Sequence, residues 1–174
     1  MRLLVFAHRG EAQTFLKAGK WDSIQAPYQG LYKSEHEYLL ITGEGPQNAT
    51  EKTAYALGSN QEIKEVINLG IAGALDKSLE LDRIYQIRTC YAQQADSPLF
   101  KSYTTDEYKE YIDCITTHER IISETSADKL RPFAQVVDRE AWAIASVASL
   151  LNKKLRYSII YLISDLRPDG PYLS

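Results

Sequence analysis

The sequence predicts an α/β fold, a three-layer α/β/α sandwich with a central mixed sheet. Short apolar runs of strand length, such as Leu3–Ala7 and Glu65–Leu69, recur along the chain. Such runs are typical of strands that are covered on both faces. Between them lie stretches with helical spacing, of which the alanine-rich Glu140–Asn152 is the clearest. Strands that alternate with helices predict a sheet with helices on both sides.

The strands are predicted from apolar runs and from alternation. Arg83–Cys90 alternates apolar and polar residues, as a half-buried strand does. Tyr28–Tyr32 is more polar, which places it nearer an edge, and Tyr111–Ile122 also carries strand-like residues. Six strands are expected to form the sheet: 3–7, 37–42, 65–69, 83–90, 135–137 and 156–163.

The helices are predicted from apolar spacing and from their end signals. Gly10 breaks the first strand, and Glu11–Ala18 has helical spacing up to Gly19. Pro46 suits the first turn of a helix that runs to about Leu57. Two more helices are expected over 126–133 and 140–152. The polar stretch 91–105, which contains a proline, is interpreted as either a lid or a long connection.

Composition limits the class of protein. The 174 residues are enough for one domain, 1–174, with a core of its own. A net charge of -3 argues against nucleic acid or an anionic membrane as a partner. No apolar run reaches membrane-spanning length. The apolar run near the start of the chain is too short for the apolar region of a signal peptide. Cys90 and Cys114 lie far apart, which favours a reducing compartment, and we expect a cytoplasmic protein.

Three separated segments each show a buried strand ending in small or polar residues. The segment 66–75 ends in glycines and alanines, which allow a ligand close to the backbone. The segments 136–141 and 159–165 place the carboxylates of Glu140 and Asp165 where a strand emerges. Ligands of α/β proteins bind at such carboxyl ends of strands. The three segments together predict a small-molecule site that uses carboxylates.

Each of these residues also has a purely structural interpretation. Asp138 fits the cap of the following helix, with Glu140 in its first turn, and Glu11 could be a first-turn acid of another helix. Asp165 has the weakest such interpretation, because prolines and a glycine follow it and no helix is visible. No histidine or cysteine has metal-ligand spacing, and no P-loop or dinucleotide fingerprint is present, so neither a metal nor a cofactor is expected.

In combination and order, the motifs resemble the purine nucleoside phosphorylase and nucleosidase superfamily. The most similar branches are the methylthioadenosine/S-adenosylhomocysteine nucleosidases and the futalosine hydrolases. The resemblance runs from Met1 to about Asp165. It rests on five motifs: the strand leading to Glu11, Gly43-x-Gly45-x-x-Asn48-Ala49, Asn68-x-Gly70-x-Ala72-Gly73-x-Leu75, Val137-Asp138-Arg139-Glu140-Ala141 and Ile163-Ser164-Asp165. The last two look like the family's D/E-M-E-G/A and I-S-D signatures.

The resemblance implies a role for each matching residue. Glu11 would orient or activate the attacking water, and Glu140 would hydrogen-bond the ribose hydroxyls. Asp165 would protonate the purine leaving group, with Ser164 contacting the base or the aspartate. The matching positions also make Gly70, Ala72 and Arg139 candidates for substrate binding. Glu11, Gly70, Glu140 and Asp165 are expected to converge on one cleft.

The chain departs from the family pattern at three places. Arg139 stands where the signature has methionine, and Ile71 stands where nucleosidases often have serine or threonine. The family's C-terminal helix is expected to be absent, since the chain stops at Ser174. The uncovered surface then predicts a homodimer or larger homo-oligomer, with 140–152 or 43–57 near the contact.

Three functions remain open on the sequence alone. The first is hydrolysis of the N-ribosidic bond of a purine nucleoside or thionucleoside. The second is phosphorolysis by the same fold, which is disfavoured because Asn68 and Ile71 stand where phosphorylases hold phosphate. Arg9 and Arg88 are the arginines that could substitute there. The third is nucleoside binding without catalysis.

Overall fold

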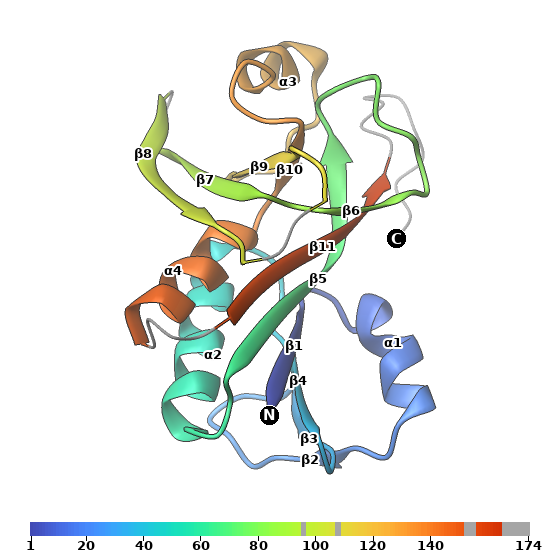
Figure 1. Ribbon diagram of the computed structural model, residues 1–174, viewed down its shortest axis with the longest axis vertical. Coiled ribbons are helices and arrows are strands. Elements are labelled where there is room, and N and C mark those ends of the chain that lie inside the picture. Colours follow the sequence, from blue (N-terminus) through green and yellow to red (C-terminus); the bar gives the residue numbers. More distant parts are fainter. Residues whose placement is uncertain (95–96, 107–108, 152–155, 165–174) are drawn as a thin grey trace.

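The computed structural model describes residues 1–94, 97–106, 109–151 and 156–164. Figure 1 shows helices arranged around one extended sheet. The helices of this described part are α1 (Arg9–Ala18), α2 (Pro46–Ser59), α3 (Glu124–Leu130) and α4 (Ala141–Leu151). The strands are β1 (Arg2–Phe6), β2 (Asp22–Ser23), β3 (Leu31–Lys33), β4 (Glu37–Ile41), β5 (Glu65–Ala74), β6 (Ile84–Gln86), β7 (Thr89–Gln94), β8 (Ser97–Thr104), β9 (Asp113–Thr116), β10 (Val136–Asp138) and β11 (Arg156–Ser164).

The sheet is mixed, and β5 is its central strand. β1 lies parallel to both β4 and β5, and β11 runs parallel to β5 along most of its length. At the far end of β5, β10 pairs with it in the antiparallel direction and is followed by β9, β7 and β8. Two groups of strands therefore approach β5 from opposite ends.

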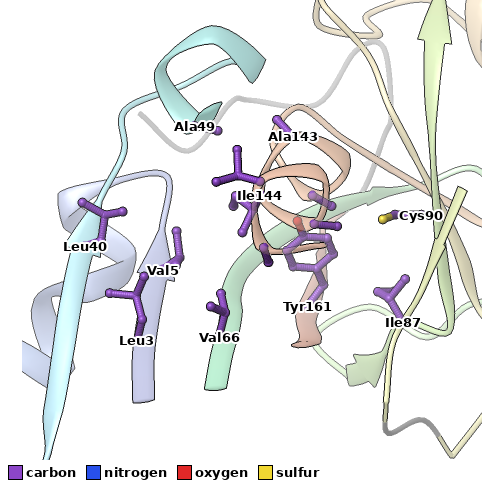
Figure 2. Close-up of a cluster of buried hydrophobic side chains, with 14 of the residues drawn as sticks. Leu3, Val5, Leu40, Ala49, Val66, Ile87, Cys90, Ala143, Ile144 and Tyr161 are labelled. Carbon is purple, nitrogen blue, oxygen red and sulfur yellow. The ribbon is translucent and has the colours of Figure 1, made fainter. Parts of the chain in front are cut away.

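Helices cover both faces of the sheet, which confirms the predicted three-layer α/β/α sandwich. Successive residues of a strand point to opposite faces, so Leu3 and Val5 pack in the main core while Leu4 and Phe6 pack in a second cluster. The main core includes residues of α2 and α4, and the second includes Ala12 of α1. Figure 2 shows Val5, Val66 and Tyr161 of the main core together with Ala143 and Ile144 of α4. α3 contributes Ala127 and Leu130 to a third cluster, around Ile115 of β9.

The predicted strands all contribute to the sheet, with one correction. The region 83–90 is not a single strand, because β6 pairs with β11 whereas β7 begins at Thr89 and pairs with β8 and β9. The undecided stretch 91–105 forms the antiparallel pair of β7 and β8 rather than a lid. The strand expected over 111–122 is limited to Asp113–Thr116.

Other boundaries shifted by only a few residues. The helix expected from Glu11 begins at Arg9, and the helix expected over 126–133 spans Glu124–Leu130. No helix in the described ranges is long and apolar enough to cross a membrane.

Candidate active site

β1 and β10 pair with different parts of β5. β1 pairs with β5 as far as Asn68, and β10 approaches from the other end and pairs as far as Gly73. β11 occupies the opposite side of β5 over the whole interval. Residues 69–72 thus lie between the carboxyl ends of β1 and β10, and Glu11, which follows β1, contacts Ile71 there. The sequence predicted a small-molecule site at such carboxyl ends of strands.

Glu11 reaches this stretch from the first turn of α1. Its Oε2 accepts a hydrogen bond from the His8 backbone N–H at 2.9 Å, and its Oε1 accepts one from the Ile71 N–H at 3.3 Å. Burial raises the pKa of Glu11, although the N–H donor at His8 and the nearby His8 side chain oppose the rise. Glu11 is therefore both a cap of α1, as its structural interpretation predicted, and a carboxylate placed against β5.

Gly70 allows this close approach. A Cβ atom at this position would lie 3.3 Å from Glu11 Oε1 and 3.5 Å from Cε1 of Tyr161. A contact of 3.3 Å is tighter than most real Cβ contacts, so a side chain here would press on the carboxylate. The sequence predicted a small-residue turn at this point. The structure instead shows Gly70 inside β5, with the ligand-accessible backbone on the strand itself.

Glu140 faces the same region from the segment between β10 and α4. Its Oε1 accepts a hydrogen bond of 2.6 Å from the backbone N–H of Gly45, which precedes α2. Burial and the neighbouring Asp138 charge raise the pKa of Glu140 to about 8. The charge of Glu11 adds to this rise, so the two carboxylates act on each other electrostatically. The structure therefore brings Glu11 to Gly70 and places Glu140 within electrostatic reach of Glu11.

Asp138 fixes the start of α4 and with it the position of Glu140. Its Oδ2 accepts hydrogen bonds from the N–H groups of Glu140 at 3.0 Å and of Ala141 at 2.6 Å. The predicted capping role is thereby confirmed. The same carboxylate is buried and also accepts from the hydroxyls of Thr116 and Tyr161. Tyr161 lies on β11, so the cap is tied to the central strands.

The remaining predicted site residues are placed by the pairing of β5 with β11. Ala72 lies opposite Ile163, and its side chain is buried in the main core. Ser164 is the last residue of β11 and lies opposite Gly73, one residue beyond that pair. Asp165 lies outside the described residues.

Arg139 does not pair with Asp138. Its Nη1 donates to Glu44 Oε2 at 2.5 Å, and its Nη2 donates to the His118 carbonyl at 2.9 Å. A Cβ atom on Gly45 would lie 3.5 Å from the same Nη2, so the guanidinium lies beside the glycine that binds Glu140. Arg139 is thus next to the residue that binds the Glu140 carboxyl.

Sequence reasoning missed Glu44 and two of its partners. Arg120 also donates to Glu44, and His8, which was interpreted as structural, lies 3.3 Å from it. The sequence feature that could have identified Glu44 is its position between two glycines, directly after a strand. Within the described ranges, no group of three histidine, cysteine or acidic side chains could hold a metal ion.

No family model matches the chain, and no curated protein matches it in sequence. Solved structures match it closely in fold. S-adenosylhomocysteine nucleosidase from Streptococcus pyogenes, in complex with 5-methylthiotubericidin, superposes with a TM-score of 0.81 at 17% identity, covering 95% of this chain and 84% of that one. The methylthioadenosine/S-adenosylhomocysteine nucleosidase from Colwellia psychrerythraea, in complex with adenine, gives a TM-score of 0.82 at 17% identity, covering 94% and 81%.

The fold is that of these nucleosidases. A futalosine hydrolase mutant from Helicobacter pylori shares it as well, with a TM-score of 0.81 at 15% identity over 94% of this chain and 90% of that one. The resemblance seen in the sequence motifs is therefore confirmed at the level of fold. In this fold, Glu11 contacts β5, and Glu140 lies within electrostatic reach of Glu11.

Proposed function

We propose that this protein hydrolyses the N-ribosidic bond of a purine nucleoside or thionucleoside. The observation that carries the proposal is the contact of Glu11 with β5 at Gly70 and Ile71, within electrostatic reach of the Glu140 carboxyl. The fold shared with nucleosidases and a futalosine hydrolase supports the same reaction class. The motif order supports it independently of the fold.

The reaction requires groups of this kind. Cleavage of an N-ribosidic bond passes through an oxocarbenium-like sugar, as in glycoside hydrolysis. The departing base must take up a proton, and a water must attack the sugar carbon with the help of a base. Carboxylates serve both needs when their pKa values are raised toward neutrality by burial.

Glu11 is assigned to the attacking water. Its carboxyl has a raised pKa, which makes the carboxylate a stronger base than an exposed glutamate. Two backbone N–H groups hold it in one orientation, from His8 and from Ile71.

Glu140 is assigned to the ribose hydroxyls. At neutral pH a carboxyl whose pKa is about 8 is largely protonated, so it can donate one hydrogen bond and accept others. The two hydroxyls of a ribose can accept the hydrogen bond that such a carboxyl donates and can donate to its other oxygen. Asp165 is assigned as the general acid that protonates the purine, and Ser164 as its neighbour at the end of β11, on the family motif alone.

Phosphorolysis has no specific support from the structure. Arg88 pairs with Asp113 through two hydrogen bonds, and Arg9 donates to the hydroxyl of Tyr32. Neither contact directs these arginines to Gly70 or Glu140. Nucleoside binding without catalysis remains the alternative that experiment must separate from hydrolysis.

A purine-release assay tests the proposal. Methylthioadenosine, adenosylhomocysteine, inosine and aminodeoxyfutalosine are incubated with the protein, with and without phosphate. We expect release of the free base that does not depend on phosphate. Glu11→Gln and Asp165→Asn should each lower kcat by at least 100-fold, the usual scale of general acid–base catalysis. Glu51→Gln, an exposed carboxylate on α2, is the matched control. Binding of nucleoside without any release would contradict the proposal.

The sequence also predicts a single domain over 1–174, a homo-oligomer and a cytoplasmic location. These three points stay predictions. The assembly prediction has its own test in the Discussion.

A further inference from the structure

The chain has two cysteines, and neither takes part in the proposed reaction. Cys90 of β7 and Cys114 of β9 are far apart in the sequence but lie directly opposite each other in the sheet. Opposed residues on neighbouring strands point to the same face, and both cysteines belong to the main core. Figure 2 shows the Cys90 side chain in this core. The fold therefore places the two thiols side by side.

The spacing of the two strands suits a disulfide. Neighbouring strands lie about 4.8 Å apart, and disulfides join residues whose Cα atoms are roughly 4.4–6.8 Å apart. Both cysteines are free thiols. Burial raises the pKa of Cys114, and the charges of Asp138 and of the Cys90 thiolate add to the rise, so the two sulfur atoms are within electrostatic reach of each other. A bond between them leaves the pairing of the strands as it is.

The Cys114 thiol also contacts the carboxylate that positions Glu140. Its Sγ donates to Asp138 Oδ1 at 3.3 Å, and the hydroxyl of Thr116 donates to the same oxygen at 2.6 Å. The other oxygen of Asp138 accepts from the backbone N–H of Glu140 at 3.0 Å. A sulfur that is bonded to Cys90 has no proton to donate to Asp138. Oxidation of the cysteine pair therefore removes one of the contacts that hold Asp138 in place.

We propose that Cys90 and Cys114 form a reversible disulfide, with a low-molecular-weight disulfide as the oxidant, and that this bond lowers the hydrolase activity through Asp138. The first thiolate attacks the small disulfide, forms a mixed disulfide and releases one small thiolate. The second thiolate displaces the other small thiolate and closes the bond between Cys90 and Cys114. Two protein thiols are thereby oxidised, one small disulfide is reduced, and the two protons pass to the released thiolates. The effect on activity rests on the proposed function, whereas the bond itself does not.

Burial governs how fast the pair reacts. Both side chains are fully buried, and burial raises the pKa of both thiols, so few thiolates form at neutral pH. Cys90 lies one strand from the edge of the sheet, because β8 is the last of the described strands on this side. Local opening at this edge gives an oxidant access to Cys90. Oxidation is therefore slow, and its extent is measured at equilibrium.

Glutathione buffers of increasing disulfide content provide the test. The folded protein is incubated until the fraction oxidised is constant, its free thiols are alkylated, and its tryptic peptides are identified by mass. We expect a disulfide between peptides 89–101 and 110–120, which hold the two cysteines. The oxidised protein should have a kcat roughly 10-fold lower, because a small displacement of a positioned group is costly. Dithiothreitol should restore both the free thiols and the activity.

Cys90→Ala is the matched control. It keeps the hydrogen bond from Cys114 to Asp138 but cannot form the disulfide, so its kcat should be the same in reducing and oxidising buffers. If this variant does not fold, the recovery of wild-type activity with dithiothreitol separates the disulfide from irreversible oxidation. Two thiols that stay reduced in the most oxidising buffer, or a cysteine that carries only glutathione, would overturn the inference.

The bond and its effect on activity are decided separately. A disulfide that leaves kcat unchanged overturns the effect through Asp138, and so does an equal loss of activity in oxidised Cys90→Ala. Absence of cleavage of any nucleoside overturns the proposed function and with it the effect on activity. In that case the linked peptides still decide whether the two cysteines form a disulfide.

Discussion

The Glu140 carboxylate accepts a hydrogen bond from the backbone N–H of Gly45, 2.6 Å away, although 95 residues separate the two in the chain. Gly45 is the residue before the 14-residue helix α2, so the carboxyl group lies at the positive end of that helix. This bond joins the segment after β4 to the segment after β10. Protonation of Glu140 is therefore coupled to the contact that holds the two sides of the site together.

The first prediction concerns stability against pH. The pKa of Glu140 is raised from 4.5 to about 8 in the folded chain, mainly by burial. The folded state thus binds the proton more tightly than the unfolded state, and the resulting stabilisation is complete below pH about 4.5. It is lost progressively as the pH rises toward 8. Glu140→Gln stays neutral and can still accept from Gly45, so its free energy of unfolding relative to wild type should rise between pH 5 and 8.

Urea unfolding of both proteins at pH 5, 6, 7 and 8 measures this difference. Glu51→Gln serves as the control, because Glu51 is exposed and should give a difference that does not change with pH. A constant difference between Glu140→Gln and wild type across this range would show that Glu140 titrates normally.

The second prediction concerns the close approach of Glu11 to β5. In Gly70→Ala, the new methyl group would lie 3.3 Å from Glu11 Oε1, so the carboxylate must move by a few tenths of an ångström. The backbone of Gly70 does not have positive φ, so alanine brings no backbone strain there. We expect kcat to fall about 10- to 100-fold, since small displacements of a positioned group are costly, while the melting temperature changes little.

Gly58→Ala on α2 is the control for a glycine replacement, because nothing lies within 4 Å of its Cβ position. Steady-state kinetics and a thermal melt are measured on both variants. Full activity of Gly70→Ala would remove the water-activating role from Glu11.

The third prediction concerns the buried hydroxyl of Tyr161. This hydroxyl donates to Asp138 and accepts from Asn68 Nδ2 at 2.8 Å. In Tyr161→Phe, the buried side chains of Asp138 and Asn68 each lose one hydrogen bond. A buried polar group that is left unsatisfied costs about 1–3 kcal/mol. We expect a loss of free energy of unfolding of that order, together with lower activity, because Asp138 holds the N–H of Glu140. Unfolding in urea and purine release provide the two readouts.

Tyr55→Phe is the comparison for Tyr161→Phe. Its ring packs on that of Tyr28 at 5.4 Å between centroids, a contact that phenylalanine retains. Both variants should keep the far-UV spectrum of the wild type. If Tyr161→Phe is as stable as Tyr55→Phe, the hydroxyl does not support the cap of α4.

The fourth prediction concerns assembly. The end of α4 carries two adjacent exposed leucines, Leu150 at 82% and Leu151 at 48% exposure. This helix is one of the two segments that the sequence predicted near a contact between copies. Exposed apolar surface of this kind favours association. We expect a homodimer in light scattering coupled to size exclusion, and a dissociation constant at least 10-fold higher for Leu150→Lys.

Leu81→Lys removes another exposed leucine, at 48% exposure and outside α4, and should leave the dimer intact. A monomer at micromolar concentration for the wild type would contradict the prediction of a homo-oligomer.

Much of the fold was predictable because apolar runs and capping residues are visible within short stretches of the sequence. Leu3–Val5 and Val66 are buried on both faces of the sheet, so their segments read as continuous apolar runs. Asp138 was predictable as a cap because capping depends on residues only two or three positions away. The split of 83–90 was not predictable, because Ile87 is as buried as a strand residue and the break depends on the partners of β6 and β7.

The sequence by itself determined which residues are candidates for the site: acids and small residues placed where buried strands end. The tertiary structure alone decided which of them meet. Glu11 contacts β5 because β1 and β10 stop on either side of residues 69–72, and that spacing depends on pairings between strands far apart in sequence. The ion pairs of Glu44 with Arg120 and Arg139 also join distant segments. Because opposite charges attract at short range whatever their separation along the chain, no local pattern records such contacts.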